Sequence, residues 1–131
     1  MIGLDSNVLL RALMNDDPIH SPLARNVLSR LSPQKRGYIN LVVLAEVTWT
    51  LARKFKAPRD EIHEIVRSLL GGENLTLEAH ERVGLALDVA KANGSGFNDA
   101  LIGVLNRHAG CMETMTFDRG APSEAGFTIL T

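Results

Sequence analysis

Residues 1–14 read MIGLDSNVLLRALM, and this stretch predicts a strand, an acidic turn and a helix in close succession. The first four residues are mostly apolar, as expected of a short buried strand, and Asp5 follows directly after them. From Ser6 onward the apolar residues recur at helical spacing on one face. A strand followed at once by a helix is the alternation from which α/β folds are built.

The same alternation continues along the rest of the chain. Apolar periodicity, first-turn prolines and glycine stops predict further helices at 22–31, 42–55, 58–70, 80–93 and 97–109, the first of them capped by Ser21. Short apolar or alternating runs predict further strands at 37–41, 74–78, 112–117 and 127–130. This order indicates an α/β fold with a largely parallel sheet, and the length of 131 residues fits one domain.

The composition excludes several classes of protein. No apolar run reaches the ~18 residues of a membrane span, and Asp5 comes too early for a signal-peptide core, so we expect a cytoplasmic protein. Cys111 is the only cysteine, which rules out an internal disulfide, and its apolar surroundings predict a buried thiol. The formal net charge of −1 gives no general attraction to nucleic acid, so any phosphate backbone must be gripped locally.

Four acidic residues differ from the others because each lies within or directly after an apolar segment. They are Asp5, Glu46, Asp99 and Asp118. Asp5 and Asp118 follow predicted strands, whose carboxyl ends are where open parallel sheets bind ligands. Glu46 has apolar neighbours on both sides, and an ionised carboxylate in a core is strongly destabilising unless a cation or hydrogen bonds compensate it. Asp99 lies in the first turn of an apolar helix.

These carboxylates also have a plain structural interpretation. Asp5 or Asp99, taken alone, can cap a helix or interact with its dipole. That interpretation is weaker for all four, since they come from separate elements. Oxygen ligands suit Mg²⁺ or Mn²⁺, whereas the four histidines lack zinc-like spacing. Phosphate-binding loops, CxxC pairs and serine-hydrolase motifs are absent, which leaves metal-assisted hydrolysis as the favoured chemistry.

Four motifs occur in an order that closely resembles the PIN-domain family, and within it the VapC-like toxins. They are IGLDSNVLLR at 2–11, LAEVTW at 44–49, GFNDALIG at 96–103 and TFDRGA at 116–121. The resemblance implies a three-layer α/β fold in which a five-stranded parallel sheet is flanked by helices. It further implies the strand order 3-2-1-4-5, which would bring Asp5 and Asp118 onto neighbouring strands.

The resemblance also implies roles for the four carboxylates. They correspond to the family's acidic metal ligands, some bound to the ion directly and some through water. One departure concerns residue 96, where many relatives carry a further acid and this chain has Gly96. We therefore expect a second metal to bind weakly, or only with substrate present.

Several neighbouring residues match positions of supporting function. Ser6 or Asn7 beside Asp5, and Thr116 near Asp118, match positions expected to orient the carboxylates. Ser6 stands where the first motif usually has threonine and keeps the hydroxyl group. Arg11 and Arg119 are basic neighbours that can contact phosphate or can form ordinary surface ion pairs, and the sequence leaves both alternatives open.

For activity, the resemblance implies an endoribonuclease that acts on single-stranded RNA with Mg²⁺ or Mn²⁺ and leaves a 5′-phosphate and a 3′-hydroxyl. It also implies the toxin of a type II toxin-antitoxin pair, a homodimer inhibited by a cognate antitoxin.

Two rival classes fit parts of the sequence. A phosphatase of the haloacid dehalogenase kind also has an acidic turn after its first strand, but it requires a second Asp where this chain has Asn7. The fold can also serve as a non-catalytic RNA-binding or scaffold module, although the presence of all four carboxylates argues against a degraded site.

Overall fold

The computed structural model describes all 131 residues, Met1–Thr131, and contains a helix or strand at every position where the sequence predicts one. The helices are α1 (Ser6–Met14), α2 (His20–Ser29), α3 (Leu41–Arg53), α4 (Arg59–Leu70), α5 (His80–Asn93) and α6 (Phe97–His108). The strands are β1 (Ile2–Gly3), β2 (Gly37–Ile39), β3 (Leu75–Leu77), β4 (Thr114–Thr116) and β5 (Phe127–Ile129), with a short 3-10 helix, η1 (Ser123–Ala125), before β5. All strand pairs are parallel, which confirms the α/β class.

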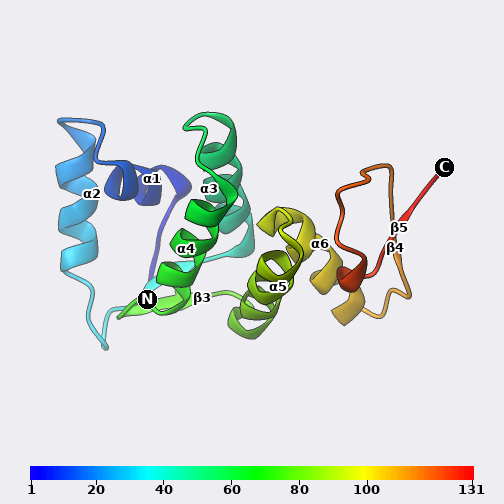
Figure 1. The fold of residues 1–131 in the computed structure, drawn as a ribbon. Helices are drawn as coiled ribbons and strands as arrows, with labels where there is room; N and C mark the ends of the chain where they lie inside the picture. Colours follow the sequence, from blue (N-terminus) through cyan, green and yellow to red (C-terminus); the bar gives the residue numbers. More distant parts are fainter.

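The strands form two separate sheets, so the expected single sheet of five strands is wrong. One sheet has the order β1-β2-β3, and the other consists of β4 and β5 alone. Figure 1 shows the two sheets toward opposite ends of the molecule, with α5 and α6 between them. The predicted order 3-2-1-4-5 thus fails at one junction, between β1 and β4. As a result, Asp5 and Asp118 do not lie on neighbouring strands.

The missing junction follows from the path of α6 and from the shortness of the strands. α6 packs along α5 and leads the chain away from β1, so that β4 finds its partner in β5 (Figure 1). On the side of β1 that faces β2, the amides of Ile2 and Leu4 donate to the carbonyls of Arg36 and Tyr38. A two-residue strand offers few further hydrogen bonds with which to attract β4.

A single apolar cluster of 20 buried residues joins the three-stranded sheet to the helices α1 and α3–α6. The helical period explains which side chains enter it: in α3, Val43, Leu44, Val47 and Leu51 are buried. Phe97 is the only aromatic residue of the cluster. The core is therefore built from aliphatic side chains, in line with an aromatic content of 5%.

The start of α2 differs from the prediction. The helix begins at His20 with Ile19 as its N-cap residue, and Oδ1 of Asp17, just before the helix, accepts hydrogen bonds from the amides of His20 at 2.8 Å and Ile19 at 2.9 Å. The His20 ring also lies 2.9 Å from the second oxygen of Asp17. The bonds from His20, and then that from Ile19, hold the pKa of Asp17 far below its usual value. Ser21 is instead buried and accepts the amide of Asp17.

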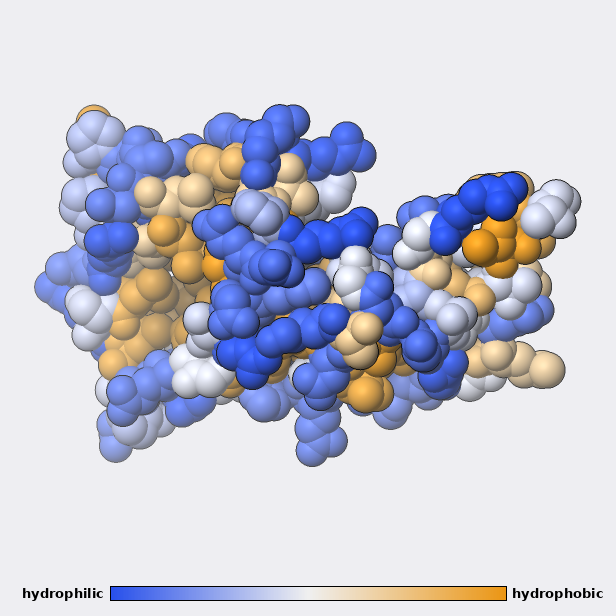
Figure 2. Space-filling model, viewed as in Figure 1, coloured by the Kyte–Doolittle hydropathy of each residue, from blue (hydrophilic) through white to orange (hydrophobic).

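The segment around β4 exposes apolar side chains. Met112 is 97% exposed and Phe117 81% exposed, and Figure 2 shows apolar residues on the surface at the end of the molecule where β4 and β5 lie. Cys111 is exposed as well, so its predicted burial is wrong. β4 has a neighbouring strand, β5, on one side only, so the residues just before β4, including Cys111, remain uncovered.

Gly103 marks the place where the C-terminal segment approaches α6. A Cβ atom at this position would lie 2.6 Å from Cβ of Ala125 and 2.8 Å from the ring of Phe127. Gly84, in the middle of α5, provides a comparison because an added Cβ there meets nothing within 4 Å. The two glycines share a helical setting and differ in what surrounds them.

We expect Gly103→Ala to lower the free energy of unfolding by about 1–3 kcal/mol, because η1 and β5 must move to admit the methyl group. Gly84→Ala should instead raise it by about 0.5–1 kcal/mol, because alanine favours the helix. Urea denaturation of both variants measures the difference. Equal stabilisation by the two substitutions would contradict the packing of the C-terminal segment on α6.

Candidate active site

Asp5, at the end of β1, and Glu46, on α3, both contact Ser6. Oδ1 of Asp5 accepts the amide of Ser6 at 2.8 Å, so Asp5 does cap α1. The buried Ser6 hydroxyl lies 3.5 Å from Oε2 of Glu46, which is a long hydrogen bond. The second oxygen of Asp5 has no hydrogen-bond partner in the protein. It remains free to take a ligand.

Glu46 is exposed, which corrects the expectation that its apolar neighbours surround it. The helical period turns Val43, Val47 and Leu51 toward the core and leaves Glu46 on the opposite face of α3. Its carboxylate therefore does not bear the penalty of a buried charge. Glu46 stays a candidate site residue because its carboxylate lies beside the Ser6 hydroxyl.

Asp99 lies half-buried in the first turn of α6. The N-cap of α6 is Gly96, and no side chain caps the helix, so Asp99 is not a capping residue. Burial raises the pKa of Asp99, the negative charge of Asp118 raises it further, and the charge of Arg59 partly opposes both. Asp118 is thus close enough to Asp99 to repel it, although Asp118 follows β4 of the two-stranded sheet and Asp99 lies on α6.

A tight turn after β4 holds Asp118. Oγ1 of Thr116 accepts the amide of Asp118 at 3.0 Å, and Oδ1 of Asp118 accepts the amide of Gly120 at 2.8 Å. Thr116 therefore contacts the backbone of Asp118, while the orientation of the carboxylate comes from Gly120. Arg119, the next residue, is exposed and makes no ion pair.

The N-terminus of α6 is fixed to α3 by a residue that sequence analysis did not single out. Oδ1 of Asn98 accepts the buried hydroxyl of Thr48 at 2.7 Å, and its amide nitrogen donates to the carbonyl of Ala45 at 3.4 Å. Asn98 and Ala45 directly adjoin Asp99 and Glu46 in sequence. The only signal for Asn98 was its position beside the candidate carboxylate in GFNDALIG.

A cleft of about 420 Å³ lies between α3, α4 and the start of α6, and Asp99 is one of its lining residues. Trp49, Arg53 and Arg59 also line it. The guanidinium carbon of Arg53 lies 5.3 Å from the centre of the Trp49 ring, which is a cation–π contact. Sequence analysis missed Trp49, although its spacing from Glu46 places both on one face of α3.

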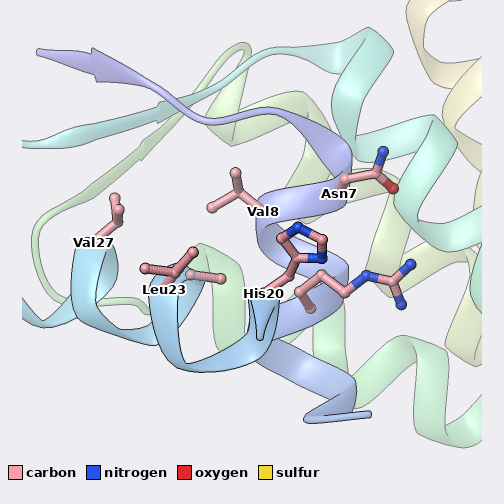
Figure 3. A pocket seen from close by; sticks show the side chains of 7 residues that line it. Asn7, Val8, His20, Leu23 and Val27 are labelled. Carbon is pink, nitrogen blue, oxygen red and sulfur yellow. The ribbon is translucent and has the colours of Figure 1, made fainter. Parts of the chain in front are cut away.

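Two other candidate residues lie elsewhere. Asn7 and Arg11 line a separate cavity of about 390 Å³ between α1 and α2. Figure 3 shows Val8 of α1 facing Leu23 and Val27 of α2 across it. Nη1 of Arg11 lies 3.1 Å from both oxygens of Asp16, so this arginine forms the ordinary surface ion pair that the sequence had left open.

The four carboxylates thus fall into two pairs: Asp99 lies near Asp118, while Asp5 and Glu46 both contact Ser6. No group of three or more His, Cys, Asp or Glu side chains lies close enough to share a metal ion. The family model for the PIN domain matches residues 2–125 of the chain. The chain belongs to the PIN-domain family. PIN domains are typically nucleases and usually use divalent metal ions, which gives these acidic pairs a chemical context.

No curated protein matches this PIN domain. None of its helices has the length and apolar character needed to span a membrane.

The electrostatics of the PIN-domain site predict the effect of Asp99→Asn on stability. Because the pKa of Asp99 is raised in the folded state, the native protein binds more protons than the unfolded chain just above the ordinary aspartate pKa near 4. The ionised carboxylate therefore destabilises the native state as the pH rises through that window. Asp99→Asn should raise the melting temperature in chelator at neutral pH and lose this advantage below about pH 3.

Asp88→Asn is the matched control, since Asp88 is exposed on α5 and its carboxylate has neither a hydrogen bond nor an ion pair. It should leave the melting temperature nearly unchanged at both pH values. A lower melting temperature for Asp99→Asn at neutral pH would mean that attraction to the helix dipole outweighs the repulsion.

Proposed function

We propose that residues 1–131 form a single PIN nuclease domain that cleaves phosphodiester bonds within single-stranded RNA, using Mg²⁺ or Mn²⁺. The products would be a 5′-phosphate and a 3′-hydroxyl. The observation that carries the proposal is the family match over residues 2–125, in a chain that retains all four of the acidic residues singled out from the sequence. These are Asp5, Glu46, Asp99 and Asp118.

The donor set supports a hard divalent cation. All four side chains offer carboxylate oxygens, the ligands that Mg²⁺ and Mn²⁺ prefer. Burial and the nearby Asp118 make the charge of Asp99 unfavourable, and a bound cation would relieve both effects. When bound, such a cation lowers the pKa of water and neutralises charge on the phosphoryl group. Asp99 with Asp118, and Asp5 with Glu46 on either side of Ser6, are the residues that would hold such cations, because no three of these carboxylates lie close enough to share one ion.

The remaining residues have positioning roles in this proposal. Ser6 holds Glu46 near the end of β1 through its hydroxyl. Asn98 ties the first turn of α6, and with it Asp99, to α3. Thr116 and Gly120 form the turn that presents Asp118. These contacts place each carboxylate on or beside a regular element, which is how a site keeps a defined geometry.

We also propose that the nuclease is the toxin of a type II toxin-antitoxin pair, acts in the cytoplasm as a homodimer, and is held inactive by a cognate antitoxin. Support comes from the four motifs that resemble VapC-like toxins. An unregulated ribonuclease would harm the cell that makes it, so a partner that blocks the acidic site is consistent with this activity.

Asp99→Asn should reduce cleavage of single-stranded RNA by about 100-fold or more, because an amide cannot supply the charge that holds the cation. Single-turnover cleavage at saturating Mn²⁺ is the measurement. Asp88→Asn, the same substitution at an exposed position on α5, is the control. Near-wild-type cleavage by the folded Asp99 variant would overturn the assignment.

The same assay separates the rival classes. Hydrolysis of a small phosphomonoester in preference to RNA would indicate a phosphatase. Binding of RNA without cleavage in Mn²⁺ would indicate a scaffold or binding module.

The antitoxin should inhibit by placing Arg or Lys side chains near Asp5, Glu46 and Asp99, where they take the place of the cations. Truncating the basic residues of the toxin-binding segment should then restore RNA cleavage while binding is retained. Cleavage assays and binding titrations of the same antitoxin variants test this. Full inhibition by a segment without any basic residue would contradict cation mimicry.

A further inference from the structure

The exposed face of α3 carries an acidic, an aromatic and a basic side chain, each about one helical turn after the one before it. They are Glu46, Trp49 and Arg53. A rise of about 1.5 Å per residue places Trp49 about 4.5 Å, and Arg53 about 10 Å, beyond Glu46 along the axis. All three side chains are exposed, so this face of α3 is available to a ligand.

Trp49 is not part of the apolar core. It is 57% exposed and makes no hydrogen bond through its indole N–H. The guanidinium group of Arg53 covers part of its ring at 5.3 Å. More than half of the side chain is still open to solvent with Arg53 in place.

The cleft beside Trp49 has the chemistry that single-stranded nucleic acid requires. Its lining includes the exposed ring of Trp49 and the buried ring of Phe97, the cations Arg53 and Arg59, and the candidate carboxylate Asp99. Its volume of about 420 Å³ lies within the range of clefts that hold small organic groups. Proteins that bind single strands combine stacking on aromatic side chains with basic groups along the backbone. A chain of net charge −1 must gather such groups locally.

The cations of the cleft are partly pre-positioned. Nη1 of Arg59 donates to the carbonyl of Gly94 at 2.7 Å, which anchors the side chain and leaves its other N–H groups available. Arg53 is oriented by its contact with Trp49. Side chains that are already ordered lose less conformational entropy when they bind a phosphate.

We propose that Trp49 is the stacking platform for an unpaired base of the RNA next to the cleaved bond, and that Arg53 and Arg59 neutralise the phosphates of that nucleotide. This inference deepens the proposed ribonuclease function and rests on it, because the platform shares its cleft with Asp99. Every base has a π-face, so the platform selects unpaired nucleotides and not a particular base. A base held in a duplex is not free to stack on Trp49.

A second copy of the chain is the other candidate for covering Trp49, since tryptophan is common at the centres of protein interfaces. Charged residues are depleted from such centres. Here Arg53 contacts the ring, Arg59 and Asp99 line the same cleft, and Glu46 lies about one turn earlier on the same face of α3. The surroundings therefore favour a charged polymer with exposed rings over an apolar protein face.

Trp49 is the only tryptophan of the chain, so its fluorescence reports directly on the platform. A single-stranded oligoribonucleotide of about 12 nucleotides, added in Ca²⁺ to limit cleavage, should quench the emission on binding. The same sequence in a duplex should quench it far less at equal concentration. Equal quenching by both forms, or none by the single strand at concentrations that saturate binding, would overturn the proposal.

A double-mutant cycle provides the decisive measurement. Trp49→Ala should weaken binding of the single strand by about 5- to 100-fold, and Trp49→Phe should recover part of the loss. Removing one base of the oligonucleotide, at the position that stacks, should weaken binding to the wild type similarly and add little further loss in Trp49→Ala. Leu85→Ala, which truncates a 54% exposed side chain on α5, is the control and should not change affinity.

The arginine that contacts the ring is tested in the same way. Arg53→Gln should lower the affinity for the single strand, and Arg53→Lys should recover only part of it, because lysine keeps the charge but lacks the planar group that stacks on the ring.

The outcomes distinguish this inference from the function on which it rests. Suppose that the wild type cleaves RNA in Mn²⁺ while base removal at every position weakens binding equally in the wild type and in Trp49→Ala. In that case the stacking role of Trp49 is wrong, and the proposed nuclease function is unaffected. If Trp49→Ala dissociates an oligomer in light scattering and RNA affinity falls only with that dissociation, Trp49 belongs to a protein interface and the platform is again overturned. A wild type that neither binds nor cleaves RNA overturns both proposals.

Discussion

The contact between the start of α6 and the middle of α3 determines the arrangement of the candidate site. The buried Thr48 hydroxyl donates to Asn98 at 2.7 Å, and its oxygen also lies 3.1 Å from the carbonyls of Leu44 and Ala45 within its own helix. A buried hydroxyl or amide left without a partner would be costly, so the two helices have one favourable register. Glu46 and Asp99 lie within two residues of these groups. The register of α3 and α6 therefore fixes how far apart these two carboxylates lie.

The same packing accounts for the divided sheet. α6 lies along α5 and leads the chain to β4 at the far end of the molecule (Figure 1). Gly103 allows η1 and β5 to press against α6, which holds the C-terminal segment there. Asp118 consequently approaches Asp99 from outside the three-stranded sheet, and its negative charge adds to the effect of burial in raising the pKa of Asp99.

Local sequence signals predict the elements of this fold well and their long-range pairing poorly. Apolar periodicity, prolines and glycine stops locate all six helices because these signals act within one element. The pairing of β1 with β4 depends on residues more than a hundred positions apart and on strands of two and three residues, where few hydrogen bonds decide the outcome. The start of α2 shows the same limit on a small scale: Ser21 was the expected cap, but the helix begins one residue earlier, at His20, and Asp17 accepts the amides of Ile19 and His20.

For the candidate site, too, the sequence predicts which residues matter better than it predicts how they lie in space. The four carboxylates can be selected from sequence because each interrupts or ends an apolar segment, and the structure brings them together as two pairs. Glu46 was selected for a partly wrong reason, since apolar neighbours along a helix do not bury a residue that points outward. Trp49 was missed for the matching reason: a tryptophan within an apolar run resembles a core residue, and only the register of α3 shows that it faces solvent.

The position of Trp49 on a helix bears on how such a nuclease can combine cleavage with recognition. Net charge gives this chain no long-range attraction to the proposed RNA substrate, so affinity for it would have to come from groups near the reacting bond. α3 carries both the carboxylate of Glu46 and the pair of Trp49 and Arg53, and helical geometry keeps the distance between them constant. A loop would allow that distance to vary. Because the contacts of Thr48 and Asn98 tie Asp99 to the same helix, the backbone itself sets the spacing between the acidic site and the stacking surface.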